Sequence, residues 1–331
     1  LVYGISEGYE PLRKPVADWL KKRNNIGKDD DTVIITSGAT QVMDLTTRVM
    51  TSEGDTIICE EPSFVGSLNC FRSHGCKLKG VPIESDGMDV VALEKTVKET
   101  PNAKFIYTIP NFQNPGGTTL SWEKRKEIYR IAKENDLLIL EDDPYGNLRV
   151  EGEDVPAIKT LDEDGIVLYA GSFSKILAPG IRVAFAVVPK KIAKAFTIGK
   201  QVSDVHTAVL NQMIVDRWFK EYDVDEHIDE IRKIYRRKLN LMCDCLDKYC
   251  SSLEYVRPQG GLFIWVKLPD NVPMTDYCKR LVENKVAVVP GTAFMTDENA
   301  QCPYIRLNFS TPSDENIIKG VEIMGKVLKE Y

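Results

Sequence analysis

The sequence predicts an α/β fold in which a mainly parallel sheet is sandwiched by helices, followed by a smaller C-terminal α+β domain. Apolar runs with strand character alternate with amphipathic helical segments over much of the chain, which is typical of parallel sheets. The chain has 331 residues, of which 43% are hydrophobic, so it can bury a large core and divide into two domains. We expect a large domain at residues 1–235 and a small domain at residues 236–331.

The first units of this alternation lie in the N-terminal part of the chain. Helical spacing covers Pro11–Arg23, where Pro15 predicts a kink or a late helix start. Val33–Thr36 follows as a strand, and Ser37 and Gly38 then turn the chain into a helix. Further strands are expected at Thr56–Cys59, Phe105–Thr108 and Leu137–Leu140, with a helix from Ser121 between the last two.

One pair of strands is expected to break the parallel pattern. Ile166–Ala170 and Val183–Val188 are both strand-like, but only about a dozen residues separate them, and Pro179-Gly180 interrupts any helix there. A parallel crossover needs at least that many residues and usually a helix, so we predict that this pair is antiparallel. Lys175 then lies in the connecting loop.

A long amphipathic helix is expected near residues 223–250, because apolar residues recur there every three or four positions. A basic run from Arg232 to Lys238 lies within it, opposite the apolar stripe, and we interpret this run as a solvated face. The small domain adds strands at Leu262–Leu268, Val286–Val289 and Tyr304–Phe309, a helix around Thr275–Glu283 and a closing helix from Ser313.

Composition argues against several classes of function. The net charge of -6 is unfavourable for a nucleic-acid surface, which needs clustered cations. No stretch is apolar for long enough to span a bilayer and no signal-peptide pattern opens the chain, so we expect a cytoplasmic protein without a membrane partner. The eight cysteines form neither a disulfide framework nor paired zinc spacing, and the three histidines are scattered, so no metal site is expected.

The segment Ser172–Arg182 is the most informative motif for the chemistry. Lys175 lies there among hydroxyl residues and near a fixed cation, Arg182. Burial near another cation lowers the pKa of a lysine, which a lysine that forms a Schiff base requires. Arg182 could also bind a phosphate, with the hydroxyls of Ser172 and Ser174 as further donors. The alternative, on this segment alone, is a solvated surface lysine.

Other segments place polar groups outside the carboxyl ends of the strands, where an open α/β sheet binds its ligand. Glu141–Gly146 is a carboxylate cluster after a buried strand, and Pro110–Gly117 is a rigid loop rich in amides. At the start of the helix after Gly38, the N–H groups of Ala39 and Thr40 suit a phosphate, unless this is an ordinary βα turn.

Together these segments resemble the pyridoxal-phosphate (PLP) aminotransferases of fold type I, class I and II. The resemblance extends over almost the whole chain. Glu141–Tyr145 combined with Leu148-Arg149 is most similar to the branch that contains kynurenine and 2-aminoadipate aminotransferases. Seven motifs carry the resemblance, in family order: Tyr3-Gly4, Ser37–Gln41, Glu61–Phe64, Asn111–Gly117, Asp142–Tyr145, Ser172–Arg182 and Arg306–Ser310.

The resemblance implies a PLP-binding large domain of fold type I and gives its catalytic residues. Lys175 is the implied Schiff-base lysine, which also moves the proton from the substrate Cα to the cofactor. Asp142 pairs with the pyridine nitrogen and keeps it protonated. Tyr145 and Asn114 hydrogen-bond the phenolic oxygen of the cofactor, and Phe64 stacks on its ring.

The resemblance also implies how the phosphate and the substrate are bound. Tyr3 matches a tyrosine that reaches the phosphate of the neighbouring subunit, which implies a homodimer. Arg306 matches the arginine that clamps the substrate α-carboxylate, a task that suits the bidentate guanidinium group, and Asn114 is a second implied substrate-binding residue. The implied phosphate ligands within one chain are Ala39, Thr40, Ser172, Ser174 and Arg182.

These roles predict an aminotransferase that moves the amino group of an L-amino acid to a 2-oxo acid by a ping-pong mechanism, with PLP as cofactor. Two alternatives stay open: a carbon–sulfur β-lyase or decarboxylase on the same fold, and the PLP-binding sensor domain of a transcription regulator. The chain departs from the family pattern at Gly117, where threonine is more usual. It also opens beyond the family's N-terminal arm, which we therefore expect to be absent.

Overall fold

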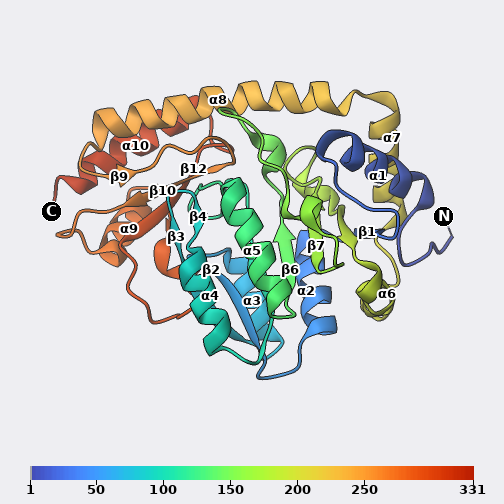
Figure 1. Cartoon of the computed structure of the whole chain (residues 1–331). Coiled ribbons are helices and arrows are strands. Elements are labelled where there is room, and N and C mark those ends of the chain that lie inside the picture. The colour runs from blue at the N-terminus through green and yellow to red at the C-terminus, as the bar shows by residue number, and fades with distance from the viewer. Residues whose placement is uncertain (1) are drawn as a thin grey trace.

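The computed structural model of the protein describes residues 2–331, and a sheet of eight strands forms its centre (Figure 1). Six strands run in one direction and two run against them. The six are β1 (Thr32–Thr36), β2 (Thr56–Glu61), β3 (Lys77–Glu84), β5 (Ala103–Thr108), β6 (Leu138–Asp142) and β7 (Val167–Ser172); the two are β4 (Gly87–Met88) and β8 (Ala184–Val188). Their order in the sheet is β1-β8-β7-β6-β5-β2-β3-β4, which confirms the predicted mainly parallel sheet.

The predicted antiparallel pair is formed by β7 and β8. Ser172 lies opposite Ala184, and the short connection between them contains Lys175. Because β8 returns at once beside β7, no crossover helix carries the chain away from the carboxyl end of the sheet. The lysine therefore stays at the edge where the parallel strands end.

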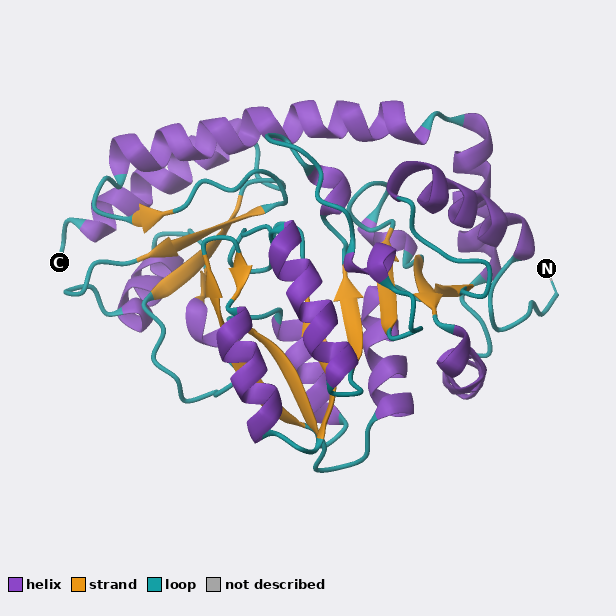
Figure 2. Cartoon of the chain, viewed as in Figure 1, coloured by secondary structure: helices purple, strands orange, loops and turns teal. Residues whose placement is uncertain are grey.

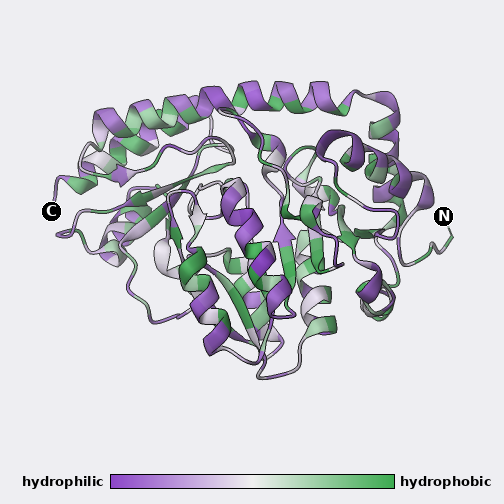
Figure 3. Ribbon diagram, in the orientation of Figure 1, coloured by the Kyte–Doolittle hydropathy of each residue, from purple (hydrophilic) through white to green (hydrophobic). Residues whose placement is uncertain are grey.

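Helices cover both faces of the sheet (Figure 2). Alternate residues of one strand serve opposite layers, as the pleat requires: Ile57 packs in the larger core, and Ile58 packs in a second core on the other face. Hydrophobic residues concentrate along the central strands in Figure 3, while the outer faces of the helices are hydrophilic. The larger core is covered by α1 (Glu10–Asn24), α2 (Ala39–Met50), α3 (Val65–Ser73), α6 (Lys190–Asp204) and α7 (Val209–Glu221); the second core is covered by α4 (Val90–Glu99) and α5 (Trp122–Glu134).

Of the two outcomes expected at Pro15, a kink or a late start of the first helix, the late start is wrong. α1 begins at Glu10 and contains Pro15 within it. Proline removes one backbone donor, but Leu12, Val16 and Leu20 are buried on a single face of this helix. Burial of this apolar face stabilises the helix in spite of the lost hydrogen bond.

A second sheet of four antiparallel strands forms the C-terminal α+β part. It consists of β9 (Glu254–Tyr255), β10 (Phe263–Lys267), β11 (Val289–Pro290) and β12 (Tyr304–Asn308), in the order β11-β12-β10-β9, and α9 (Met274–Glu283) and α10 (Asp314–Leu328) pack on it. The strand expected at Val286–Val289 is reduced to Val289–Pro290. Lys285 leaves α9 with a left-handed φ of 63°, and the N–H of Val286 donates back to Leu281, so the chain reaches the sheet edge three residues late.

The long helix α8 (Val224–Tyr249) crosses the top of the molecule and joins the two parts (Figure 1). Its 26 residues span about 39 Å at the usual rise per residue. Ile228 belongs to the core of the large sheet, Met242 belongs to the core of the small sheet, and Tyr235 packs against both. Among the helices in residues 2–331, none has both the length and the apolar character needed to cross a membrane.

Candidate active site

A cavity of about 310 Å³ lies at the carboxyl ends of β5, β6 and β7 and is closed by the small sheet. The first turn of α2 and the loops after these strands form one side of it. Phe263 on β10 and Arg306 on β12 form the other. Eleven predicted site residues line this single cavity: Ala39, Thr40, Phe64, Asn114, Asp142, Tyr145, Ser172, Ser174, Lys175, Arg182 and Arg306.

Lys175 provides a nucleophilic amine in this cavity. The neighbouring side chains of Phe173 and Ile176 are fully buried, which anchors the loop on both sides of the lysine. Burial lowers the pKa of Lys175 from its ordinary value, and the positive charges of Arg182 and Arg306 lower it further. A larger fraction of the amine is therefore neutral and reactive than in an exposed lysine.

One corner of the cavity is built to receive an anion. The first turn of α2 begins after Gly38, and no described side chain caps its free N–H groups. Arg182 packs directly on this turn, because a Cβ atom added to Gly38 would lie only 1.9 Å from Nη2 of Arg182. Gly38 also has a φ of 88°, so glycine is required here both for conformation and for the approach of the guanidinium group. Helix N–H groups and an arginine together favour a phosphate.

A buried polar network that the sequence did not reveal supports this corner from behind. Asp204 accepts hydrogen bonds from Ser37 Oγ and Gln41 Nε2, both at 2.8 Å. Lys200, whose side chain is fully buried, donates to the same carboxylate at 2.9 Å and to Thr207 Oγ1 at 3.0 Å. These bonds fix the turn that precedes α2.

Asp142 is the last residue of β6, and its two carboxylate oxygens differ in their hydrogen bonding. Its Oδ2 accepts a hydrogen bond of 2.8 Å from the hydroxyl of Tyr107. Its Oδ1 is buried and has no hydrogen-bond partner among residues 2–331. Burial raises the pKa of Asp142 to about 7, the hydrogen bond from Tyr107 opposes this rise, and the charge of Asp143 adds to it. A cationic N–H group placed at Oδ1 would satisfy this oxygen and favour its charged form.

Asn114 joins two other functional groups. Its Oδ1 accepts from Nη1 of Arg306 at 2.8 Å, and its Nδ2 donates to the hydroxyl of Tyr145 at 3.3 Å. Arg306 lies over the ring of Phe263, with 4.1 Å from Cζ to the ring centroid, and its buried Nε has no partner among the described residues. Burial lowers the pKa of Arg306 and raises that of Tyr145. The arginine is therefore held in place with donors still available for an anion.

The loop that carries Asn114 is held by buried ions. Arg125, which is fully buried, donates to the carbonyl oxygen of Pro110 at 3.0 Å and to Oδ1 of Asn111 at 2.7 Å. Gln113 donates to Glu60 at 3.1 Å and to the carbonyl oxygen of Pro62 at 2.8 Å. The amide-rich loop thus has a fixed conformation, as an orienting residue needs.

The chemistry of these groups fits PLP. Its aldehyde requires an amine of lowered pKa, which Lys175 provides, and its ring nitrogen requires a buried oxygen acceptor, which is Asp142 Oδ1. Its phosphate requires an anion site, which the first turn of α2 and Arg182 form. The three sites lie in one cavity.

Tyr3 is the predicted site residue that does not line the cavity of its own chain. Its side chain is 87% exposed and contacts the ring of His206 edge-on, with 5.9 Å between centroids. Its predicted contact with a neighbouring subunit stays a prediction.

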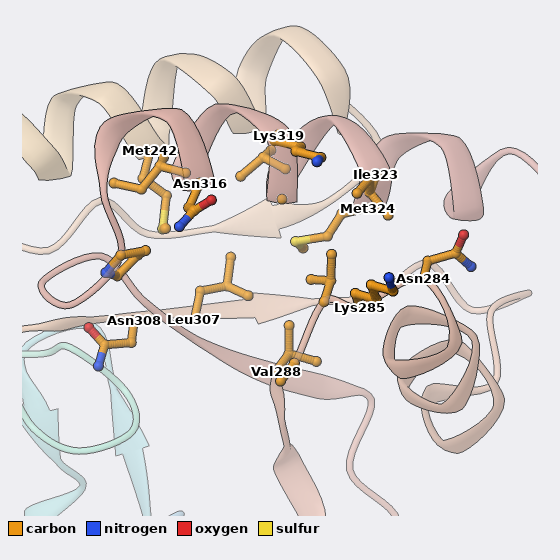
Figure 4. Close-up of a pocket in the computed structure, with 16 residues that line it drawn as sticks. Met242, Asn284, Lys285, Val288, Leu307, Asn308, Asn316, Lys319, Ile323 and Met324 are labelled. Carbon is orange, nitrogen blue, oxygen red and sulfur yellow. The ribbon is translucent and has the colours of Figure 1, made fainter.

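Two other features lie outside this cavity. A second cavity, of about 430 Å³, lies between α8, α10 and β12, and its lining includes Lys285, Leu307 and Met324 (Figure 4). It contains no predicted site residue. Asp44, Cys70 and His74 place three possible metal-ligand atoms within 4.8 Å of one another, a grouping that their sequence spacing did not reveal. His74 Nε2 and Asp44 Oδ1 are already hydrogen-bonded at 2.8 Å.

Comparisons with known proteins agree with this geometry. Residues 1–323 match the family described as Aminotransferase class I and II. The chain is 34% identical to aromatic-amino-acid aminotransferase 1 of Thermococcus litoralis, over 100% of this chain and 80% of that protein. It is 37% identical to 2-aminoadipate transaminase of Thermus thermophilus, over 99% of this chain and 82% of that protein.

Solved structures give the same result. The crystal structure of Pyrococcus horikoshii kynurenine aminotransferase, in complex with PMP, has a TM-score of 0.95 and 36% identity, and the match covers 100% of this chain and 82% of that one. These matches favour transamination over the lyase, decarboxylase and sensor alternatives. The chain therefore belongs to the class I and II aminotransferases, and it is a PLP-dependent enzyme that transfers amino groups between amino acids and 2-oxo acids.

Proposed function

We propose that Lys175, Asp142, Arg182 and Arg306 carry out the transamination in the cavity at the end of the large sheet. One observation carries this proposal. Four groups face the same cavity: a half-buried amine of lowered pKa, a buried carboxylate oxygen and a helix end that no side chain of residues 2–331 binds, the latter with an arginine beside it, and a second arginine. A phosphorylated cofactor together with an amino acid would use all four of these protein groups, and few other pairs of ligands would.

The cofactor, when bound, supplies the electron sink for bond breaking at the substrate Cα. Asp142 would hold the proton on its ring nitrogen, and Phe64 would pack against its ring. Tyr145 and Asn114 would donate hydrogen bonds to its phenolic oxygen. The N–H groups of Ala39 and Thr40 and the side chains of Ser172, Ser174 and Arg182 would hold its phosphate.

Two residues act directly on the substrate. Arg306 binds the α-carboxylate through its guanidinium group, and Asn114 fixes the orientation of that group by accepting from Nη1. Lys175 Nζ would take the proton from the substrate Cα and hold it for transfer, a role that needs the neutral amine. Its lowered pKa supports this role. The same groups then act in reverse order on the 2-oxo acid.

We also propose that the chain divides into domains at residues 1–235 and 236–331. Tyr235 packs against both cores on α8, which supports a boundary near this residue. The cavity then lies between the domains, since Arg306 comes from the small sheet and Lys175 from the large one.

We propose further that the active form is a homodimer in which Tyr3 reaches the phosphate site of the neighbouring subunit. Several large apolar side chains on α6 and α7 are exposed, among them Val202 at 70% and Leu210 at 55%. Both helices lie on the same side of the molecule as α1 (Figure 1). A second copy of the chain would cover them. Tyr3→Phe should then raise the dissociation constant for PLP about tenfold, as expected for a lost hydrogen bond to a charged group.

The matched control for this prediction is Tyr222→Phe, which alters another exposed tyrosine. Equilibrium titration of each apoprotein with PLP measures the affinity, and sedimentation velocity measures the mass in solution. A monomer, or an equal effect of both substitutions, would contradict the proposal.

The amino donors that we propose are aromatic amino acids, kynurenine and 2-aminoadipate, because the relatives named above carry these activities. The test is the absorbance of the PLP-loaded protein with single L-amino acids and no acceptor. We expect these donors to convert bound PLP to pyridoxamine phosphate, and a 2-oxo acid to reverse the change. Alanine and aspartate serve as comparison donors. Faster conversion by either of them would contradict the proposed donor class, and no conversion by any amino acid would contradict the proposed site.

A further inference from the structure

A chain of buried hydroxyl groups leads to Asp142 from behind the cavity. The hydroxyl of Tyr107 on β5 donates to Asp142 Oδ2 at 2.8 Å, and Oγ of Ser67 on α3 lies 2.8 Å from the same hydroxyl. Tyr107 is fully buried and Ser67 is 1% exposed. Ser67 also lines the cavity, whereas Tyr107 does not.

The direction of these hydrogen bonds follows from the donors available. An ionised carboxylate only accepts, so Tyr107 must donate its single proton to Asp142. The oxygen of Tyr107 is then an acceptor, and Ser67 must donate to it. Burial, followed by the charge of Asp142, raises the pKa of Tyr107 well above its ordinary value, so the phenol keeps the proton that it donates. The order of donation is Ser67 to Tyr107 to Asp142.

Packing leaves the tyrosine little freedom to move. In the parallel pairing of β5 with β6, Tyr107 lies beside Leu140, two residues before Asp142 and therefore on the same face of the sheet. The ring of Phe71 meets the Tyr107 ring edge-on, with 5.2 Å between centroids. The hydroxyl is thus fixed at one carboxylate oxygen, which leaves Oδ1 as the oxygen without a partner among the described residues.

We propose that Tyr107 is a positioning residue for Asp142 and is held in turn by Ser67. This pair directs Oδ1 toward the cofactor's ring nitrogen and keeps on that nitrogen the proton that it shares with Asp142. The inference rests on the role proposed above for Asp142. Without the bond from Tyr107, Asp142 attracts a proton more strongly, because a hydrogen bond to the charged form is lost while burial and the neighbouring negative charge of Asp143 remain. The proton then moves from the ring nitrogen toward the carboxyl group.

The test is Tyr107→Phe, which removes only the hydroxyl and keeps the ring in the core. The protein is loaded with PLP labelled with ¹⁵N in the ring, and the ¹⁵N chemical shift reports the protonation of that nitrogen. We expect a pyridinium-like shift in the parent protein and a shift toward neutral pyridine in the variant. We also expect the dissociation constant for PLP to rise about tenfold, as for other lost hydrogen bonds to charged groups.

Tyr169→Phe is a closely matched control. Tyr169 is a buried tyrosine on the next strand but one, and its hydroxyl donates to Asp143 Oδ2 at 3.0 Å. Removal of this hydroxyl makes a change in the core comparable to Tyr107→Phe, but beside Asp143, a carboxylate that does not line the cavity. Because Asp143 does not line the cavity, this variant should leave the ¹⁵N shift unchanged.

Ser67→Ala tests the second bond of the chain. It should move the ¹⁵N shift in the same direction as Tyr107→Phe, but by less. In the Tyr107→Phe background it should have no additional effect, because its partner is gone. Additive effects of the two substitutions would show that Ser67 acts independently of Tyr107, and would overturn its part in the proposal.

Asp142→Ala separates this inference from the function on which it rests. If the alanine variant changes the ¹⁵N shift and Tyr107→Phe does not, the positioning role is wrong while the role of Asp142 stands. If neither variant changes the shift, the role of Asp142 itself is wrong. If Tyr107→Phe and Tyr169→Phe change the shift equally and in the same direction, the effect is a general one of core polarity and the proposal fails.

Discussion

Replacement of Lys175 with alanine is expected to abolish transamination while the protein still binds PLP. The substitution removes the amine that we propose attaches the cofactor covalently and acts as the base at the substrate Cα. The proposed phosphate site does not depend on this side chain, because the first turn of α2 and Arg182 form it. We expect turnover to fall by at least about 10³-fold, in the range seen when an essential catalytic group is removed.

Three measurements together check this prediction. The absorbance of the variant with PLP should lose the band of covalently attached cofactor and show that of the free aldehyde. A titration should show weakened but measurable PLP binding, and the unfolding temperature of the apoprotein should stay close to that of the parent. Lys124→Ala is a suitable control, because Lys124 is a partly buried lysine paired with Glu84 and Asp86 outside the cavity. A covalent band that persists without Lys175 would show that another amine attaches the cofactor.

Asp142→Ala is expected to have the second largest effect. Removal of a preorganised charge at the electron sink should reduce turnover by about 100-fold or more, as for other electrostatic groups in active sites. PLP should also bind about tenfold more weakly. Steady-state kinetics at saturating PLP separate the two effects, and turnover close to that of the parent would show that another group protonates the ring.

In the apoprotein, the same substitution should change stability in a pH-dependent way. Relative to the parent, the variant should become more stable as pH rises. Burial raises the pKa of Asp142 to about 7, whereas the unfolded chain has the ordinary value, so the unfolded state loses this proton at lower pH than the folded state does. The carboxyl group therefore costs the folded state free energy that grows from the unfolded pKa up to about pH 7 and is constant above it. The unfolding temperature of Asp142→Ala relative to the parent should thus be higher at pH 8 than at pH 4. If this difference in unfolding temperature does not change with pH, the charged carboxyl group does not destabilise the folded protein.

Much of the fold was predictable because local sequence determines it. The parallel strands are continuous apolar runs, and the antiparallel pair of β7 and β8 follows from a connection too short for a crossover. The late helix start at Pro15 and the full strand at Val286–Val289 were wrong for a common reason: tertiary packing decided both, through the buried face of α1 and the turn at Lys285. Strand order, with β1 placed beside β8 at one edge, depends on long-range contacts that no local pattern contains.

The candidate site likewise contains residues that local motifs predict and residues that only long-range contacts bring together. Residues within continuous motifs, such as Lys175 and Asp142, were predicted and line one cavity. Tyr107 and Ser67 were not, because each lies in a segment that reads as ordinary core, and their contact joins positions 40 residues apart. Asp204 and Lys200 escaped prediction for the same reason, since an i,i+4 pair on a helix normally lies on the surface.

The side chain of Asn114 serves Arg306 with its oxygen and Tyr145 with its nitrogen. A single planar amide cannot rotate to improve one of these bonds without changing the other. Occupation of Arg306 by a carboxylate and the acidity of the Tyr145 hydroxyl are therefore linked, and thermodynamic reciprocity requires the linkage to be equal in both directions. Through this one amide, the part of the cavity proposed to bind the carboxylate that all amino acids share is coupled to the part that would adjust the reactivity of the cofactor.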